Sequence, residues 1–174
     1  LITYTDGCDV KQTAVTIDES KSNEVLLAPL TEDALIDKLE YLLSGGGCAG
    51  VIVNTVKRAQ EVVRMLRDHF GQDIVRLLHS RFIAPDRIAK EQEMLIELGK
   101  PGKGNHRPQK RILVGTQVLE QSLDIDFDIM VTDLCPMDLL LQRIGRLHRH
   151  ERPRPEKLSQ ALCLIMGIDC DEFE

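Results

Sequence analysis

The sequence predicts an α/β fold in which a mostly parallel sheet carries helices on both faces. Short apolar runs of strand length alternate with longer segments of helical periodicity between residues 31 and 168. Strands that are joined through helices form right-handed crossovers, which place successive strands parallel in one sheet. Hydrophobic residues make up 43% of the 174 residues and charged residues 29%, a composition typical of a globular chain with its own core.

Charge and cysteine content narrow the functional classes. The formal net charge is -6, so a nucleic-acid partner would need a local groove, because no basic field covers the whole surface. The five cysteines are scattered and none forms a C-x-x-C pair, which disfavours a disulfide framework or a zinc cluster. No apolar run reaches the roughly 18–20 residues that span a membrane. We therefore expect a cytoplasmic protein with no membrane partner.

The two ends of the chain differ from its centre. Residues 1–30 hold three short β-leaning runs separated by turn-like segments, and they predict a β-rich N-terminal extension or linker strands. These strands are expected as a hairpin or as edge strands. Residues 169–174 form an acidic tail, and the chain begins with Leu1 rather than methionine, which indicates a piece of a longer protein. The three runs are Leu1–Tyr4, Thr13–Asp18 and Glu24–Ala28.

Four helices are expected in the body of the chain. Thr31, followed by two acidic residues, is typical of a helix start, and this helix is expected to run to about Ser44. Residues 45–50 satisfy G-x-G-x-x-G, but here the glycines follow a helix and open a strand, whereas the dinucleotide motif does the reverse. They predict a helix stop and a turn. The other helices are expected after Asn54, from Pro85 to Leu98 and from Met137 to His148.

Five buried-type strands are expected after residue 31, and four of them end in polar side chains. In a parallel sheet of this kind ligands bind beyond the carboxyl ends of the strands, so these side chains mark a candidate site. They are Asn54 and Thr55, His79 and Ser80, Thr116 and Gln117, and Thr132 and Asp133. The strands are expected at Gly50–Asn54, Asp73–His79, Lys110–Gly115, Asp128–Thr132 and Gln160–Met166.

The last predicted helix combines an apolar stripe with arginines. Its expected core stripe is Met137, Leu140, Leu141 and Ile144. Gln142, Arg146 and Arg149 follow at helical spacing on the opposite face. Gly145 lies between them, and glycine is costly inside a helix unless another group must approach closely. Arginine presents a planar fork that suits phosphate oxygens, so the pair predicts a phosphate clamp. The alternative is an exposed basic helix end that complements the helix dipole.

Two segments resemble helicase motifs. Residues 142–149, Q-R-I-G-R-L-H-R, match the Q-x-x-G-R-x-x-R pattern of motif VI in superfamily 2 helicases. Residues 114–126, V-G-T-Q-V-L-E-Q-S-L-D-I-D, resemble motif V, although residues 121–124 replace the R-G-x-D that many members carry. With V-T-D-L-C-P-M-D-L-L-L and L-L-H-S-R-F, they resemble the helicase part of the CRISPR-associated helicase–nuclease of type I interference systems. The resemblance covers roughly residues 32–166.

This resemblance implies that residues 31–168 form the second, C-terminal RecA-like lobe of an ATP-dependent DNA helicase. In such helicases ATP lies between two lobes, and Arg146 and Arg149 would be the arginine fingers that stabilise charge on the γ-phosphoryl group. The residues expected at the nucleotide are Gln142, Arg146, Arg149, Asp124 and Gly145. Those expected to contact single-stranded DNA are Thr116, Gln117, Asn54, Thr55, His79 and Ser80.

The family's other functional motifs do not occur in these residues. There is no G-x-x-x-x-G-K-[ST] phosphate loop, no D-E-x-[HD] run and no His-Asp pair of the family's nuclease domain. ATP is therefore expected to be shared with a first RecA-like lobe that also holds Mg²⁺, and no metal site is expected here. The other expected partners are the nuclease domain of the parent protein and the CRISPR RNA-guided surveillance complex. The chain alone is predicted to be inactive as an ATPase.

Two alternatives to a motor lobe stay open. One is a non-catalytic, helicase-like module that docks nucleic acid or protein, and the other is the equivalent lobe of an RNA helicase. Three polar features are given structural roles. The basic loop at residues 100–111 is expected to be solvated, residues 152–155 are expected to form a stiff linker, and Glu120 is expected to brace its loop rather than to act as a base.

Overall fold

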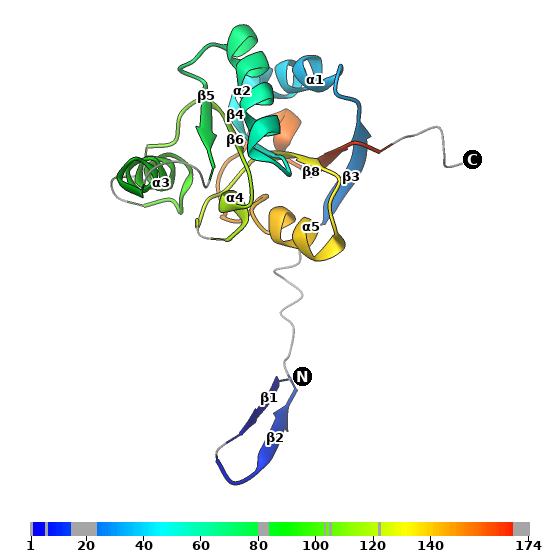
Figure 1. The fold of residues 1–174 in the computed structure, drawn as a ribbon, viewed down its shortest axis with the longest axis vertical. Coiled ribbons are helices and arrows are strands. Elements are labelled where there is room, and N and C mark those ends of the chain that lie inside the picture. Colours follow the sequence, from blue (N-terminus) through cyan, green and yellow to red (C-terminus); the bar gives the residue numbers. More distant parts are fainter. Residues whose placement is uncertain are drawn as a thin grey trace, which may run out of the picture.

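Six strands form one parallel sheet (Figure 1). The computed structural model describes residues 2–5, 7–14, 24–79, 84–102, 104, 106–121 and 123–168. The strand order is β3-β8-β7-β4-β6-β5, and every neighbouring pair is parallel. The predicted α/β fold with a parallel sheet is therefore confirmed. The strands are β3 (Val25–Leu30), β4 (Gly47–Ile52), β5 (Val75–Leu78), β6 (Lys110–Gly115), β7 (Ile129–Asp133) and β8 (Ala161–Met166).

The centre of the sheet is β4, which lies between β6 and β7. All of its residues are buried, and they pair in register with Lys110–Gly115. Gly50 has a packing role, because a Cβ atom there would lie 2.6 Å from the ring of Phe127. The missing side chain thus lets Phe127, in the loop before β7, pack directly on the central strand.

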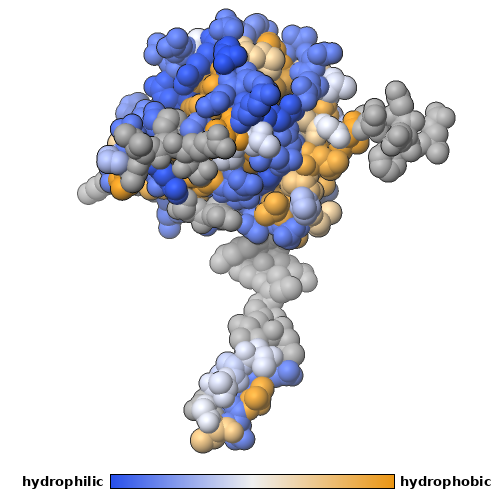
Figure 2. All heavy atoms as spheres, in the orientation of Figure 1, coloured by the Kyte–Doolittle hydropathy of each residue, from blue (hydrophilic) through white to orange (hydrophobic). Residues whose placement is uncertain are grey.

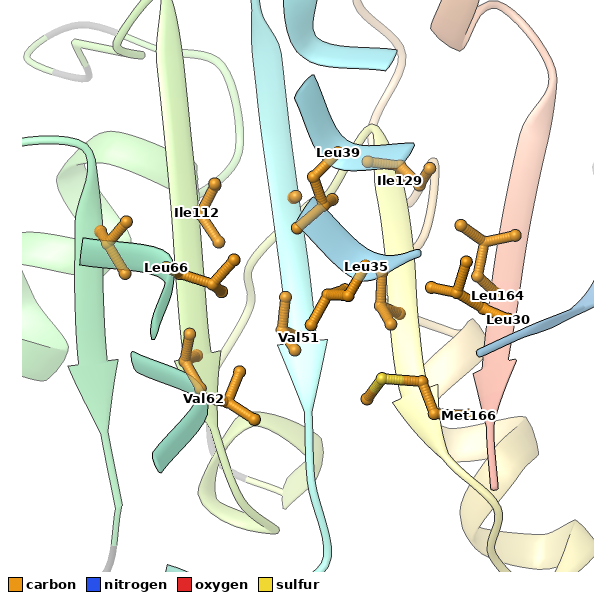
Figure 3. Packing of buried hydrophobic residues seen from close by; sticks show 14 of the residues in the cluster. Leu30, Leu35, Leu39, Val51, Val62, Leu66, Ile112, Ile129, Leu164 and Met166 are labelled. Carbon is orange, nitrogen blue, oxygen red and sulfur yellow. The ribbon is translucent and has the colours of Figure 1, made fainter. Parts of the chain in front are cut away.

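Helices cover both faces of the sheet, as predicted. The first core packs α1 and α2 over one face, and Figure 3 shows Leu35 and Leu39 of α1 lying over Val51 of β4. The second core packs α3, α4 and α5 on the opposite face, which Ile52 of β4 and Phe127 also line. No helix in the described segments is long and apolar enough to cross a membrane. The helices are α1 (Leu35–Leu42), α2 (Val56–Phe70), α3 (Ala84–Leu98), α4 (Val118–Gln121) and α5 (Met137–Ile144), with short 3-10 turns at Leu43–Gly45 and Glu156–Leu158.

The first helix begins later than predicted. Thr31 does not cap it with its side chain; instead the Thr31 carbonyl accepts a hydrogen bond from the Ala34 N–H at 3.2 Å, and α1 starts at Leu35. The Thr–acidic pattern therefore makes a turn that precedes the helix. By contrast, Thr55 does cap α2, because its hydroxyl accepts a hydrogen bond from the Arg58 N–H at 3.2 Å.

The N-terminal strands divide between two sheets. β1 (Ile2–Thr5) and β2 (Val10–Thr13) form a two-stranded antiparallel sheet. β3, which the sequence assigned to the extension at residues 1–30, is the edge strand of the main sheet and pairs with β8. The division of the chain at residue 30 stays a prediction, and the expected acidic tail at residues 169–174 lies outside the described residues.

Candidate functional site

Helix α5 presents a different face to the core from the one that the sequence predicted. Met137 and Leu141 of the expected apolar stripe are 65% and 61% exposed, and Leu140 is buried. Hydrophobic side chains are visible on the surface at the position of α5 in Figure 2. Arg143, which the sequence analysis did not single out, is fully buried. The stripe was right for Leu140 and for Ile144, which packs against the second core, and wrong for Met137 and Leu141, because an arginine with polar partners at the strand ends occupies a core position of this helix.

Arg143 joins the ends of several strands. Its Nε donates to Glu120 Oε1 at 2.7 Å, and one terminal nitrogen donates to Thr132 Oγ1 at 2.6 Å. The other terminal nitrogen donates to Asn54 Oδ1 at 3.1 Å. Asn54 follows β4, Thr132 lies at the end of β7, and Glu120 lies on α4, which follows β6. The guanidinium therefore links these three segments at the carboxyl edge of the sheet. A buried arginine needs such a set of acceptors to offset its desolvation.

Asn54 and Thr55, expected to contact nucleic acid, also stabilise the lobe. The Asn54 side chain donates to the Leu134 carbonyl at 2.9 Å as well as accepting from Arg143, and Thr55 caps α2. Asp133 accepts from the backbone N–H of Asn54 and pairs with Arg58 at 2.8 Å. Asn54 and Thr55 nevertheless remain exposed at the carboxyl edge, so their contact with nucleic acid stays a prediction.

The other four predicted nucleic-acid contacts lie in unlike surroundings. Thr116 is 1% exposed and His79 is 5% exposed, so neither side chain offers a surface to a strand in this conformation. Gln117 is exposed beside Thr116. Ser80 lies outside the described residues. For Thr116 and His79 the burial argues against direct contact, because the polar atoms of a phosphate-binding side chain must reach solvent.

Arg146 and Arg149 lie beyond the end of α5 and not on it. The helix ends at Ile144 and Gly145 is its C-cap, whose N–H still donates to the Leu141 carbonyl at 3.0 Å, so Gly145 follows the helix instead of interrupting it. The chain then pairs with the loop before β7, where the Phe127 N–H donates to the Arg146 carbonyl at 2.9 Å. His148 takes a positive φ of 50° in this turn.

The two predicted fingers are held by neighbouring groups of the motif V segment. A terminal nitrogen of Arg146 donates to the Glu120 carbonyl at 2.6 Å, and its Nε is buried with no hydrogen-bond partner among the described residues. Arg149 Nε donates to Asp124 Oδ1 at 2.5 Å. Gln142, the remaining predicted residue of this set, is exposed on α5. The structure thus brings Arg146, Arg149 and Asp124 together.

Electrostatics at this group favour an anionic ligand. Burial lowers the pKa of the Arg146 guanidinium, and the positive charge of Arg149 lowers it further, while Asp124 acts in the opposite direction. Burial raises the pKa of the Asp124 carboxyl, but the hydrogen bond from Arg149 and the nearby positive charges outweigh it, so this pKa lies below its usual range. Two guanidinium charges that repel each other gain most from a negative group between them.

A second group of buried charges lies at the amino-terminal edge of the sheet. Asp126 and Asp128, which are 0% and 2% exposed, accept from Arg154, and Arg107 donates to Asp128 at 2.6 Å. Arg152 Nε lies 2.6 Å from Asp126 as an ion pair whose N–H direction does not align for a hydrogen bond. Arg152 and Arg154 are therefore an internal anchor, which corrects the expectation of a stiff linker at residues 152–155. The basic loop is exposed at residues 100–102, 104, 106 and 109, as predicted, but not at Arg107 and Arg111, whose side chains are paired with Asp128 and Glu97.

The described residues hold no group of three or more His, Cys, Asp or Glu side chains that could bind a metal ion. Asp126 and Asp128 are already paired with arginines, and Glu120 is paired with Arg143. This part of the chain therefore does not fit the Mg²⁺ that accompanies ATP. The assignment of Mg²⁺ to another lobe stays a prediction.

Comparison with known proteins agrees with this geometry. The model of the family described as "CRISPR-associated nuclease/helicase Cas3, C-terminal" matches residues 45–152. The CRISPR-associated nuclease/helicase Cas3 of Streptococcus thermophilus is 50% identical over 174 residues, which are 100% of this chain and 18% of that protein. The chain thus spans about a fifth of the length of this relative.

Solved structures show the same fold. The T. fusca Cas3–ATP crystal structure is similar with a TM-score of 0.79 and 33% identity, over 92% of this chain and 19% of that chain. A CRISPR RNA-guided surveillance complex in a pre-nicking state contains a chain with a TM-score of 0.72 and 32% identity, over 94% of this chain and 20% of that one.

The C-terminal domain of the DEAD-box protein Dbp5 shares only the fold, with a TM-score of 0.56, 18% identity and coverage of 87% of this chain and 79% of that chain. The predicted RecA-like architecture is thereby confirmed. The family match, the relatives and the shared fold together show that this chain belongs to the Cas3 family of CRISPR-associated nuclease/helicases, as the C-terminal lobe of its superfamily 2 helicase part.

Proposed function

We propose that this chain is the second motor lobe of an ATP-dependent DNA helicase that translocates along single-stranded DNA in CRISPR type I interference, where foreign DNA is degraded. The observation that carries the proposal is the placement of two arginines of the Q-x-x-G-R-x-x-R segment. Arg146 and Arg149 lie just beyond α5, held by the Glu120 carbonyl and by Asp124, and remain partly exposed. Their mutual repulsion favours a bound anion.

The chemistry assigned to these residues is charge stabilisation. In ATP hydrolysis a water oxygen bonds to the γ-phosphorus, the bond to the β–γ bridging oxygen breaks, and ADP and phosphate leave. Arg146 and Arg149 bind the γ-phosphoryl oxygens as negative charge redistributes, a contribution of about 10³–10⁵ in turnover. Asp124 orients Arg149 through its hydrogen bond. Gly145 follows the end of α5, so that Arg146 and Arg149 lie in the turn after the helix. Gln142, on α5, is assigned to contact the nucleotide.

Contact with single-stranded DNA is assigned to the carboxyl edge of the sheet. Asn54, Thr55 and Gln117 are exposed there and carry neutral hydrogen-bonding groups. Contacts with the sugar–phosphate backbone give a grip that does not depend on sequence, as a translocating motor requires. Thr116 and His79 enter this interface only if the edge opens, because both are buried in this conformation.

The proposed activity belongs to a larger protein. The chain corresponds to 18% of the Streptococcus thermophilus relative, and the phosphate loop, the Mg²⁺-binding carboxylates and the nuclease domain are assigned to other parts of the parent protein. The similar chain in the pre-nicking surveillance complex supports a CRISPR RNA-guided complex as the partner that supplies the DNA. The 174-residue chain alone is proposed to hydrolyse no ATP.

The test is Arg146→Ala in the full-length parent protein, with Arg64→Ala as the matched control. Arg64 is an exposed arginine on α2, on the face of the sheet opposite α5. We expect Arg146→Ala to abolish ATP hydrolysis stimulated by single-stranded DNA while DNA binding survives, and Arg64→Ala to retain both. Wild-type turnover in Arg146→Ala would refute the finger assignment.

A comparison of polynucleotides separates the alternatives. The motor proposal predicts that single-stranded DNA stimulates ATP hydrolysis of the full-length protein and that single-stranded RNA does so much less. Stimulation by RNA alone would favour an RNA helicase, and binding without any stimulation would favour a docking module.

A further inference from the structure

Glu120 holds two arginines through two different atoms. Its side-chain Oε1 accepts from Arg143 Nε at 2.7 Å, and its backbone carbonyl accepts from a terminal nitrogen of Arg146 at 2.6 Å. Glu120 lies on α4, a single turn at Val118–Gln121. A turn this short has little rigidity of its own, so the position of the Glu120 carbonyl depends on what α4 contacts: the core around the buried Val118 and Leu119, and Arg143 through the Glu120 side chain.

The other end of this arrangement is fixed to the sheet. Besides Glu120, Arg143 donates to Thr132 Oγ1 at 2.6 Å and to the Asp133 carbonyl at 3.2 Å, at the end of β7. It also donates to Asn54 just after β4. Because its planar fork engages all of these acceptors, Arg143 can transfer the rigidity of two central strands to α4.

Stability alone does not account for an ion pair at this place. The side chains of Arg143 and Glu120 are both 0% exposed, and Glu120 Oε2 is buried with no hydrogen-bond partner among the described residues. A buried pair that is incompletely satisfied often stabilises a fold no better than apolar side chains of similar volume. Apolar side chains, however, would not fix the direction of the Glu120 carbonyl.

We propose that Glu120 and Arg143 form a positioning pair that sets the guanidinium of Arg146 for ATP hydrolysis. The pair touches no nucleotide itself; it locks α4 to the sheet so that the Glu120 carbonyl presents Arg146 in one orientation. This inference rests on the proposed function, because it assumes that Arg146 is a finger. A misplacement of about 1 Å at such a group can cost about 10²-fold in rate.

The decisive variant replaces both partners at once, as Glu120→Leu/Arg143→Met in the full-length protein. Apolar side chains of similar size remove both buried charges together, so the thermal midpoint is expected to stay close to that of the wild type. At saturating single-stranded DNA, kcat for ATP is expected to fall by about tenfold to a hundredfold. KM for ATP should change by less than about twofold, because the lost interaction acts in the transition state.

A purely structural pair gives a different result. If the pair only stabilises the fold, the double variant should keep wild-type kcat as long as its thermal midpoint is that of the wild type. Wild-type kcat at a wild-type midpoint would therefore overturn the proposal. If the double variant does not fold, Arg143→Lys decides, since lysine keeps the charge opposite Glu120 but lacks the fork that reaches Thr132 and Asn54. We then expect kcat to fall by at least about fivefold at unchanged KM. A kcat within about twofold of the wild type in this variant would equally overturn the proposal.

Arg154→Lys is the matched control. Arg154 also forms a buried ion pair, with Asp128, whose side chains are 7% and 2% exposed, at the opposite edge of the sheet. The same substitution there is expected to lower the thermal midpoint and to leave kcat unchanged. A fall in kcat in this control as large as that in Arg143→Lys would show that loss of packing accounts for both.

Arg146→Ala separates this inference from the proposed function. If Arg146→Ala turns over normally, the finger assignment fails and the pair has no finger to position. If Arg146→Ala is inactive while the double variant keeps wild-type kcat, the proposed function stands and only the positioning role is refuted.

Discussion

The five arginines in residues 143–154 fall into two groups that differ in what neutralises their charge. Arg143 and Arg154 are buried against the carboxylates of Glu120, Asp126 and Asp128. Arg152 belongs with them, 9% exposed beside Asp126. The buried group lies at both ends of the segment, where it ties the chain to opposite edges of the sheet. These arginines have protein carboxylates as partners and need no ligand.

The second group, Arg146 and Arg149, lies between these anchors. Arg146 donates to a backbone carbonyl, and Arg149 pairs with Asp124, whose side chain is 51% exposed. Their charges are incompletely neutralised and partly open to solvent. One arginine-rich segment therefore combines arginines that are buried against carboxylates with arginines that stay partly open to solvent, and our proposals assign a ligand only to the second kind.

The largest effect on stability is expected from removing the most deeply buried arginine of the first group, with Arg143→Ala. The change leaves the Glu120 carboxylate buried without its partner, so the free energy of unfolding should fall by about 3–5 kcal/mol. Urea denaturation of the 174-residue chain measures this, with the wild-type chain as reference. A loss below about 1 kcal/mol would mean that water reaches the Glu120 carboxylate, so that its ion pair with Arg143 is not buried.

A smaller loss is expected at the opposite edge, with Arg154→Ala. Arg107 remains within 2.6 Å of Asp128, and Arg152 remains beside Asp126, so both carboxylates keep a cationic partner. The free energy of unfolding should fall by about 1–3 kcal/mol in the same urea experiment. The full-length variant should hydrolyse ATP like the wild type below its transition temperature. Loss of activity there would mean that the anchor also shapes the site.

Arg149→Ala tests the second group and should change stability by less than about 1 kcal/mol, because its ion pair with Asp124 is exposed to solvent. In the full-length protein, however, the proposed function predicts that ATP hydrolysis is lost, since it assigns this guanidinium to the γ-phosphoryl group. The opposite pattern, destabilisation with activity retained, would place Arg149 in the structural group.

The division between these groups could be predicted from the sequence only in part. Lys110–Gly115 was predicted to the residue, because apolar strand runs bounded by polar residues are local signals. Arg146 and Arg149 could be singled out because their spacing matches a motif. Arg143 could not, since its partners Glu120, Thr132 and Asn54 come from three distant segments, and a periodic pattern treats every arginine as exposed.

The same limit explains the end of α5. The continuous helix expected through His148 follows from local propensity alone, whereas the observed end at Ile144 depends on pairing with residue 127. Glu120 gave a weak signal, because it follows the apolar pair Val118 and Leu119, and a carboxylate that such a segment buries requires a cationic partner. That signal predicts a partner without saying which of the five arginines it is.

The smallest effect concerns the pH dependence of the Asp124–Arg149 pair. The pKa of Asp124 is held below its ordinary value of 3.8 in the folded chain, so ionised Asp124 adds stability above about that pH. This contribution is lost as the pH falls through the lowered pKa, when the folded carboxyl also binds its proton. Asp124→Asn should therefore be slightly less stable than the wild type near pH 6, and the difference should shrink as the pH is lowered below about 3.8, by urea denaturation across that range.

Arg149→Ala supplies the control for this titration. Without the guanidinium, the hydrogen bond that lowers the pKa of Asp124 is gone, so the added Asp124→Asn change should cost less near neutral pH than it does in the wild type. A cost that is equal in both backgrounds would mean that Asp124 interacts mainly with other charges. Arg149 would then lack its carboxylate partner, and both predicted fingers would depend on a bound anion for neutralisation.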